Sequence, residues 1–168
     1  VNENLAKNVL PLLKANEIVA LIRFQAMMES IHEEVYSVAF HHLVTDPNER
    51  ARLIDSAKTS NFIRWKSQWA RKWIERQDIP FAVRLMAFVC VETIFFQTQF
   101  ASVQHVVDKA KEFGGMPGIE KSNAFISRDE GNHGDSSIEI ISLMDAKLPK
   151  RLVELIIREA TTIEKACI

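Results

Sequence analysis

Apolar residues along most of this chain recur at intervals of three and four, which is the spacing of one face of an α-helix. The clearest case is the segment 17–43, whose apolar positions include Leu21, Phe24, Met28, Ile31, Val35 and Ala39. No segment alternates convincingly between apolar and polar residues, so no β-strand is predicted. Glycine and proline number only five each, and they gather at a few positions that mark helix ends.

These breaks divide the chain into helices joined by short connections. Helices are predicted over residues 4–13, 17–43, 47–53, 60–76, 80–111, 122–144 and 150–165. Asp46 before Pro47 is typical of a helix cap followed by proline in the first turn. A run of glycine and proline at 114–118 ends one helix, and Ser122 or Asn123 is the expected cap of the next. Long helices with short connections predict an all-α fold, an antiparallel bundle forming a single domain over the whole chain.

Composition narrows the class of protein. Hydrophobic residues make up 47% and charged residues 26%, the balance of a soluble globular domain, and a net charge of −1 gives no general attraction to nucleic acid or membranes. The longest apolar run, around Phe88 to Phe96, is interrupted by Glu92 and Thr93, so no membrane span is predicted. The two cysteines, Cys90 and Cys167, lie far apart, which favours a reducing compartment and predicts a cytoplasmic protein.

Two Glu-x-x-His sequences stand far apart in the chain, Glu29 to His32 and Glu130 to His133. In a helix, positions three apart share a face, so a carboxylate and an imidazole can bind one metal ion together. One such pair is weak evidence, because so short a motif arises by chance. Two pairs, both within apolar stretches, point to a shared metal site, because burying four such groups without partners would be costly.

A further carboxylate lies in an apolar helix. Glu92 has apolar residues on both sides, and a glutamate there needs a cation or a hydrogen-bond partner. The alternative to a metal ligand is a buried salt bridge with an arginine or lysine. Ferritin-like di-iron and di-manganese proteins take one glutamate from each of two helices and a Glu-x-x-His from each of two others. This sequence supplies both Glu-x-x-His helices and one of the single-carboxylate helices.

Tyr36 is the only tyrosine, and it stands one turn after His32 on the same helix face. Phe96, Phe100 and Ile126 share faces with the glutamates of their own helices. If these side chains surround the Tyr36 phenol within reach of a metal, the phenol is well placed to be oxidised to a radical and shielded from quenching. The alternative is an ordinary half-buried tyrosine.

Other conspicuous residues have simpler interpretations. Tryptophans recur at a spacing of four, which predicts core packing: Trp65, Trp69 and Trp73. The remaining histidines are expected on the surface or at helix ends: His41, His42 and His105. Cys90 is on a different helix face from Glu92 and is expected in the core.

Several of these segments resemble one known family. The segment from Gln25 to Ser37, the string Val-Glu-Thr-Ile-Phe-Phe at 91–96, and Ser-Arg-Asp-Glu-Gly-Asn-His at 127–133 carry the resemblance. Arg64-Trp65 and the loop 116–119 add to it. Along nearly its whole length the chain resembles the radical-bearing small subunit of a class I ribonucleotide reductase, of the eukaryotic and viral type.

The resemblance implies a ferritin-like helical bundle with a dinuclear metal site between core helices. It implies two iron ions, or manganese, with dioxygen as oxidant, and Tyr36 as the radical site. The ligands that it implies are Glu29, His32, Glu92, Glu130 and His133. Asp129 matches an acid that hydrogen-bonds a ligand histidine, here His32. The radical would pass to a separate large subunit, where ribonucleotides become deoxyribonucleotides, and the small subunit would form a homodimer.

The chain departs from the family's pattern in three ways. The remaining ligand of the family is an aspartate expected just before Val1, and the family's radical path uses an upstream tryptophan and a tyrosine in a C-terminal tail. The segment 103–114 looks a few residues longer than usual. We therefore expect a fragment truncated at both ends, which alone binds metal weakly and forms no stable radical.

Three alternatives share parts of this pattern. A ferritin-like storage protein would have the carboxylates and histidines, but it would not need Tyr36 and would assemble into a shell. A ligand-binding oxidase of the same superfamily would lack a large-subunit partner, and the string at 127–133 argues against it. A non-catalytic helical scaffold would bind no metal.

Overall fold

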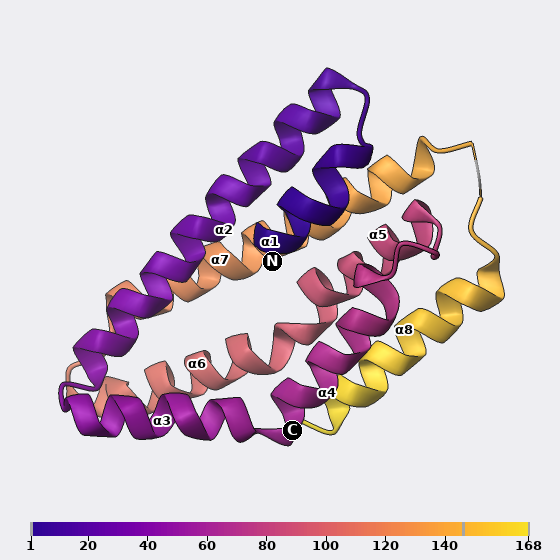
Figure 1. Cartoon of the computed structure of the whole chain (residues 1–168). Helices are drawn as coiled ribbons and strands as arrows, with labels where there is room; N and C mark the ends of the chain where they lie inside the picture. The colour runs from indigo at the N-terminus through magenta and orange to yellow at the C-terminus, as the bar shows by residue number, and fades with distance from the viewer. Residues whose placement is uncertain (1, 146, 168) are drawn as a thin grey trace. The chain divides into compact units, whose positions relative to one another are not determined.

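The computed structural model describes residues 2–145 and 147–167, which are helical almost throughout and contain no β-strand (Figure 1). The chain divides between Glu75 and Arg76 into two compact units. They are called the first and the second unit below, and each is described by itself. The prediction of an all-α protein is confirmed.

The first unit is built around one long helix. Its elements are α1 (Asn2–Asn4), the π-helix η1 (Leu5–Val9), the 3-10 helix η2 (Leu10–Leu12), α2 (Asn16–Leu43), α3 (Pro47–Thr59), α4 (Asn61–Ala70) and the π-helix η3 (Arg71–Glu75). The predicted helix at 4–13 is thus a succession of short turns, and Pro11, which has no N–H to donate, lies in the last of them. These turns pack against α2, and α3 packs against α4.

The start of α3 confirms the predicted cap. The backbone N–H of Asn48 donates to Oδ1 of Asp46 at 2.9 Å, and Pro47 is the first helical residue. The helix ends at Thr59 rather than at Leu53, because its polar second half contains no helix breaker.

The tryptophan stripe is only partly in the core. Trp69 and Trp73 are buried, as predicted. Trp65 is 38% exposed, and its ring lies edge-on to Phe62, with centroids 5.7 Å apart. The spacing of four therefore identified one helix face correctly, but the burial of that face decreases toward its start.

The second unit is a bundle of helices around α5. Its elements are α5 (Phe81–Cys90), the π-helix η4 (Val91–Phe95), α6 (Gln97–Ala110), the 3-10 helix η5 (Lys111–Phe113), α7 (Pro117–Ser142) and α8 (Lys150–Lys165). α5 packs against both α7 and α8, and α6 packs against α7 (Figure 1). The core between them consists of apolar side chains, among them Leu85, Phe88, Val107, Ile140 and Ile156.

The turn before α7 corrects the sequence prediction. Gly114 and Gly115 have φ of 101° and 77°, in the left-handed region that glycine adopts without strain. Pro117 then opens α7, because its fixed φ suits the first helical position. The predicted start at Ser122 or Asn123 is wrong. Asn123 is buried within α7 instead, and its amide donates to the carbonyl oxygen of Phe100 at 3.2 Å.

The helical stretch 81–113 also modifies the prediction about membranes. By length and composition alone it is apolar enough to cross a membrane, because one window of 18 residues within it has a mean hydropathy of 1.5 and at most 2 charged residues. More than half of its most apolar window is buried inside the molecule. Its apolar character is explained by its position in the core of the second unit, where Leu85 and Phe88 are almost fully buried.

Candidate metal centre

The π-helical turn η4, which interrupts the helical stretch from α5 to α6, positions Glu92. The π-helical turn Val91–Phe95 stands between α5 and α6, and a single π turn within an α-helix is a feature that recurs at functional sites. The turn is stabilised locally, since Thr93 Oγ1 donates to the carbonyl of Val89 at 2.8 Å and Gln97 Nε2 donates to the carbonyl of Thr93 at 3.0 Å. Glu92 lies in this turn and is completely buried.

A carboxylate from the last helix holds the start of α6. The backbone N–H of Thr98 donates to Oε1 of Glu164 at 2.7 Å. The first N–H groups of a helix have no partner within that helix, so a buried carboxylate there satisfies a donor and complements the helix dipole. Glu164 of α8 therefore fixes where the helix resumes after the turn that carries Glu92.

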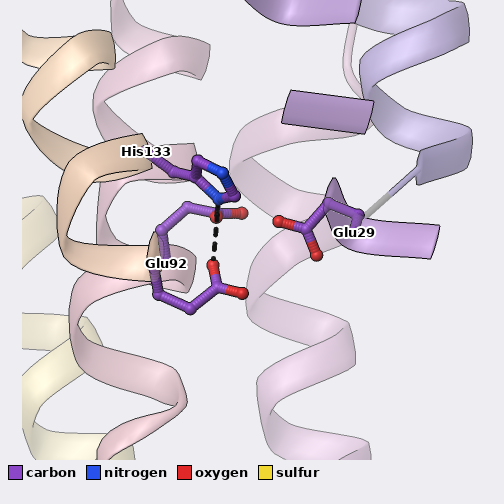
Figure 2. A group of neighbouring side chains, drawn as sticks. Glu29, Glu92 and His133 are labelled. Carbon is purple, nitrogen blue, oxygen red and sulfur yellow. Dashed lines mark hydrogen bonds and ion pairs between the residues drawn. The ribbon is translucent and has the colours of Figure 1, made fainter. Parts of the chain in front are cut away.

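Helix α7 brings Glu130 and His133 to the same place. α7 packs against both α5 and η4, and both side chains are buried. Nδ1 of His133 lies 3.4 Å from Oε2 of Glu130 and 3.4 Å from Oε2 of Glu92. Figure 2 shows His133 and Glu92 pointing toward each other; Glu29, drawn in the same view, belongs to the first unit. Of the five side chains that were predicted to converge, these three of the second unit lie close together.

These three residues could hold a metal ion. Each offers a ligand atom, and these atoms lie within 4.8 Å of one another. Two buried carboxylates beside one imidazole carry an excess of negative charge, which burial penalises unless a cation balances it. Oxygen and nitrogen donors of this kind suit iron and manganese. The residues present therefore fit the metal that the resemblance implies.

In the first unit, one face of α2 is buried and mostly polar. The buried residues of α2 are Ile22, Gln25, Glu29 and His32. Glu29 and His32 are the predicted ligands, and three polar side chains among four buried positions is unusual for a helix. Tyr36 is half-buried one turn further along. That Glu29 and His32 join the residues of the second unit stays a prediction.

The residues predicted to surround Tyr36 belong to the second unit. Phe100 and Ile126 are buried, and Phe96 is partly exposed. The rings of Phe96 and Phe100 meet edge to face, with centroids 6.3 Å apart. α6 and α7, which carry Phe100 and Ile126, pack against each other. These residues thus form an apolar group within their unit, and their contact with Tyr36 stays a prediction.

Asp129 is less buried than its neighbour Glu130. Its side chain is 21% exposed, and its Oδ1 lies 3.6 Å from the guanidinium of Arg128. The hydrogen bond predicted from Asp129 to His32 would join the two units and stays a prediction.

The predictions for the other histidines and for Cys90 are confirmed. The three other histidines are exposed: His41, His42 and His105. Cys90 is buried in the core, and burial raises the pKa of its thiol to about 12, because the thiolate would lose its hydration.

Four buried polar residues of the described chain were not identified from the sequence: Gln25, Arg84, Ser137 and Glu164. Gln25 lies one turn before Glu29, a signal that the sequence did contain. Arg84 is buried in α5 and donates to Oε1 of Gln77 at 3.3 Å. Glu164 gave no sequence signal, because its partner Thr98 lies far away along the chain.

Comparison with known proteins agrees with this geometry. The family described as "Ribonucleotide reductase, small chain" matches residues 1–168. The ribonucleoside-diphosphate reductase small chain of Schizosaccharomyces pombe is 39% identical over 165 residues, which are 98% of this chain and 41% of that protein. One of the small chains of the same enzyme in Arabidopsis thaliana is 40% identical over 164 residues, covering 98% of this chain and 47% of that protein. This chain therefore spans less than half the length of these two relatives.

A solved structure is similar as well. The structure of the ribonucleotide reductase Rnr4 homodimer from Saccharomyces cerevisiae superimposes with a TM-score of 0.86 and 32% sequence identity. The match covers 98% of this chain and 51% of that chain. The similarity in structure supports the ferritin-like helical fold that the resemblance predicted.

Proposed function

This chain belongs to the ribonucleotide reductase small chain family, and we propose that it serves as the radical-generating subunit of a ribonucleoside-diphosphate reductase. The observation that carries the proposal is the buried cluster of Glu92, Glu130 and His133, whose ligand atoms lie within 4.8 Å of one another. A family match over residues 1–168 favours this function over a storage protein or a ligand-binding oxidase.

The complete site is proposed to hold two iron ions, with manganese as the alternative. Glu29 and His32 would join it, because both are buried on one face of α2 and repeat the Glu-x-x-His spacing found in α7, and the aspartate expected before Val1 would complete it. When bound, the metal ions would supply oxidising chemistry with dioxygen. The chain's own carboxylates would balance the ionic charge, and His133 would bind through a neutral nitrogen.

Tyr36 is proposed as the residue that is oxidised. Its phenol would give up one electron and its proton, becoming a neutral radical. Phe96, Phe100 and Ile126 would shield the ring, because their apolar side chains carry no group that readily donates a hydrogen atom or electron. Asp129 would orient His32 by accepting a hydrogen bond from the ring nitrogen that does not face the metal.

The proposed partners are a second copy of the chain and a large subunit. The Rnr4 structure is described as a homodimer, which supports a dimer here. Reduction of the ribonucleotide would take place in the large subunit, which receives the radical equivalent. We propose a cytoplasmic location, since the two cysteines, Cys90 and Cys167, lie far apart along the chain, which favours a reducing compartment.

The decisive experiment replaces Tyr36 with phenylalanine. The complete protein, including the segment before Val1 in which the remaining aspartate ligand is expected, is loaded with Fe²⁺ without oxygen and exposed to air, and the radical is followed by electron paramagnetic resonance. We expect a tyrosyl signal in the parent and its complete loss in Tyr36→Phe, with iron content unchanged, because the ring is kept and only the oxidisable hydroxyl is removed. A parent that binds iron but yields no radical would contradict the proposed function. A signal of equal size in both proteins would assign the radical to another residue.

A further inference from the structure

One glycine marks the closest approach between α7 and the π-helical turn η4. A methyl group added at Gly134 would lie 2.3 Å from Cγ2 of Thr93, far inside van der Waals contact. Gly134 follows His133 directly, and Thr93 follows Glu92 directly. The contact therefore lies beside the pair whose atoms, His133 Nδ1 and Glu92 Oε2, are 3.4 Å apart.

The methyl group of Thr93 is not free to turn away. Its hydroxyl donates to the carbonyl of Val89 at 2.8 Å, which fixes the side-chain torsion. Threonine is also stiff about this bond, because it is branched at Cβ. Rotation would break the hydrogen bond within the turn that carries Glu92. A side chain at position 134 would therefore push α7 and η4 apart.

We infer that Gly134 is a positioning residue for the metal centre: its missing side chain lets α7 approach η4 and so sets the separation of His133 from Glu92. The inference rests on the proposed function, since the separation matters for a bound ion. Metal–ligand distances vary little, so ligands on two helices bind one ion only if the helices are held at a fixed spacing.

A second glycine in the same helix provides a contrast. Gly131 follows Glu130 directly, as Gly134 follows His133. A methyl group added at Gly131 has no neighbour within 4 Å, and Gly131 is exposed, whereas Gly134 is buried. Glycine is generally unfavourable inside a helix. The packing of α7 therefore requires glycine at position 134 and not at position 131.

The test compares four variants of the complete protein, including the segment before Val1, by Mn²⁺ binding in equilibrium dialysis. We expect Gly134→Ala to weaken Mn²⁺ binding by about 10- to 100-fold, the range typical of groups that orient metal ligands. The matched control, Gly131→Ala, should bind like the parent. Thr93→Ser, which removes the methyl group and keeps the hydroxyl, should also bind nearly like the parent.

The double variant Gly134→Ala with Thr93→Ser is the sharpest test. Once Cγ2 is removed, the nearest atom to the new methyl group is Cβ of residue 93, at 3.8 Å, an ordinary contact distance. The double variant should therefore recover Mn²⁺ affinity, and it should do so even if Gly134→Ala alone fails to fold. Parent-like affinity in Gly134→Ala, or no recovery in a folded double variant, would overturn the inference and leave the proposed function standing.

Thermal unfolding of the metal-free proteins separates the two proposals. Gly134→Ala should melt at a lower temperature than the parent, and the double variant should regain most of the loss. If the parent itself binds no Mn²⁺, the proposed metal site fails, while the melting temperatures still report the spacing. Equal melting temperatures for Gly134→Ala and Gly131→Ala would show that Thr93 does not restrict position 134.

Discussion

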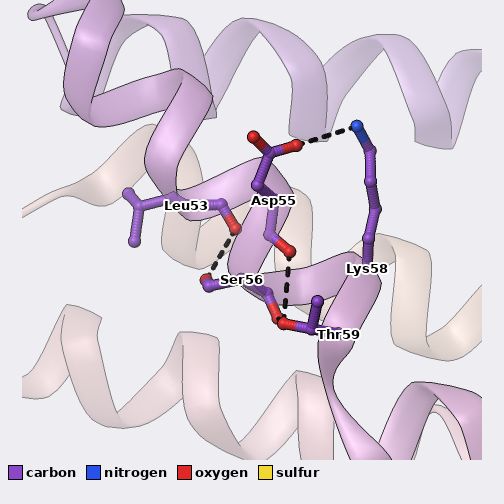
Figure 3. Close-up of polar contacts among 5 residues, drawn as sticks. All are labelled: Leu53, Asp55, Ser56, Lys58 and Thr59. Carbon is purple, nitrogen blue, oxygen red and sulfur yellow. Dashed lines mark hydrogen bonds and ion pairs between the residues drawn. The ribbon is translucent and has the colours of Figure 1, made fainter.

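The end of α3 and the metal centre use charged side chains in opposite ways. In α3, Nζ of Lys58 lies 3.0 Å from Oδ1 of Asp55, and about three quarters of each side chain is exposed. The hydroxyl of Ser56 donates to the carbonyl of Leu53, and that of Thr59 donates to the carbonyls of Asp55 and Ser56 (Figure 3). Every one of these contacts joins residues three or four apart, on the surface of one helix.

At the candidate metal centre the side chains are buried, and one contact, between His133 and Glu92, joins two different elements. Glu92 comes from η4, and Glu130 and His133 come from α7; at most 9% of any of these side chains is exposed. An exposed pair remains hydrated whether or not it forms, so it contributes little to stability. Buried carboxylates lose their hydration on folding, and they are retained where a ligand balances their charge. The difference teaches that burial, and not the mere presence of an ion pair, distinguishes the candidate metal centre from the solvated surface of α3.

The largest effect is expected from Glu92→Gln, which keeps the shape of the side chain and removes its charge. Metal affinity should fall by more than the roughly 10- to 100-fold typical of residues that only orient a ligand. Without metal, the free energy of unfolding should stay equal or rise, because one of two neighbouring buried charges is gone. Metal titration and urea unfolding of the metal-free protein measure the two effects.

The critical feature of Glu92→Gln is that metal affinity should fall while the stability of the metal-free protein stays equal or rises. If the variant loses stability and metal affinity together, the carboxylate serves the packing of the bundle. The contrast between the two regions would then disappear, since both sets of charges would be structural.

Asp129 is an intermediate case, because its side chain is partly exposed and lies beside Arg128. If it orients His32 as proposed, Asp129→Asn should keep the fold and weaken metal binding by about 10- to 100-fold. Circular dichroism and metal titration check the two parts. Unchanged affinity would place Asp129 with the solvated charges of α3.

The smallest effect is expected from Asp55→Asn. The exposed pair with Lys58 is screened by water, so the free energy of unfolding should change by less than about 0.5 kcal/mol, and the change should shrink further at high salt. Metal affinity should not change. Urea unfolding at low and high salt provides the measurement. A loss above about 1 kcal/mol would exceed what exposed pairs contribute and would require a contact beyond Lys58.

The helices could be predicted because their signals are local. The spacing of apolar residues predicted a helix at 17–43, and the structure has Asn16–Leu43. The π turn at Val91–Phe95 was not predicted, because one extra residue per turn only shifts the apolar face and does not interrupt it. The start of α7 was placed too late, because Ser122 or Asn123 was expected to cap a helix that already begins at Pro117.

The convergence of the candidate ligands in the second unit could be predicted for the same reason. Glu130 and His133 lie one turn apart, so the sequence shows that they share a face. Gly134 and Glu164 could not be found in this way, because each acts through a residue on another element, Thr93 and Thr98 respectively. Sequence spacing thus identifies candidate ligands on one helix face, whereas residues that contact another element appear only once the helices are packed.

The hydrogen bond between Thr98 and Glu164 has a consequence for the order of assembly during synthesis. It spans 66 residues, while Glu92, Glu130 and His133 are all present once residue 133 has been made. Contacts between distant residues form late in folding, because the chain entropy of the intervening loop must first be lost. The helix that resumes after Glu92 therefore acquires its buried cap only when α8 has emerged and docked. Until then Glu92, Glu130 and His133 exist without the final geometry of the turn, so metal binding at the proposed site would follow completion of the second unit and would not guide it.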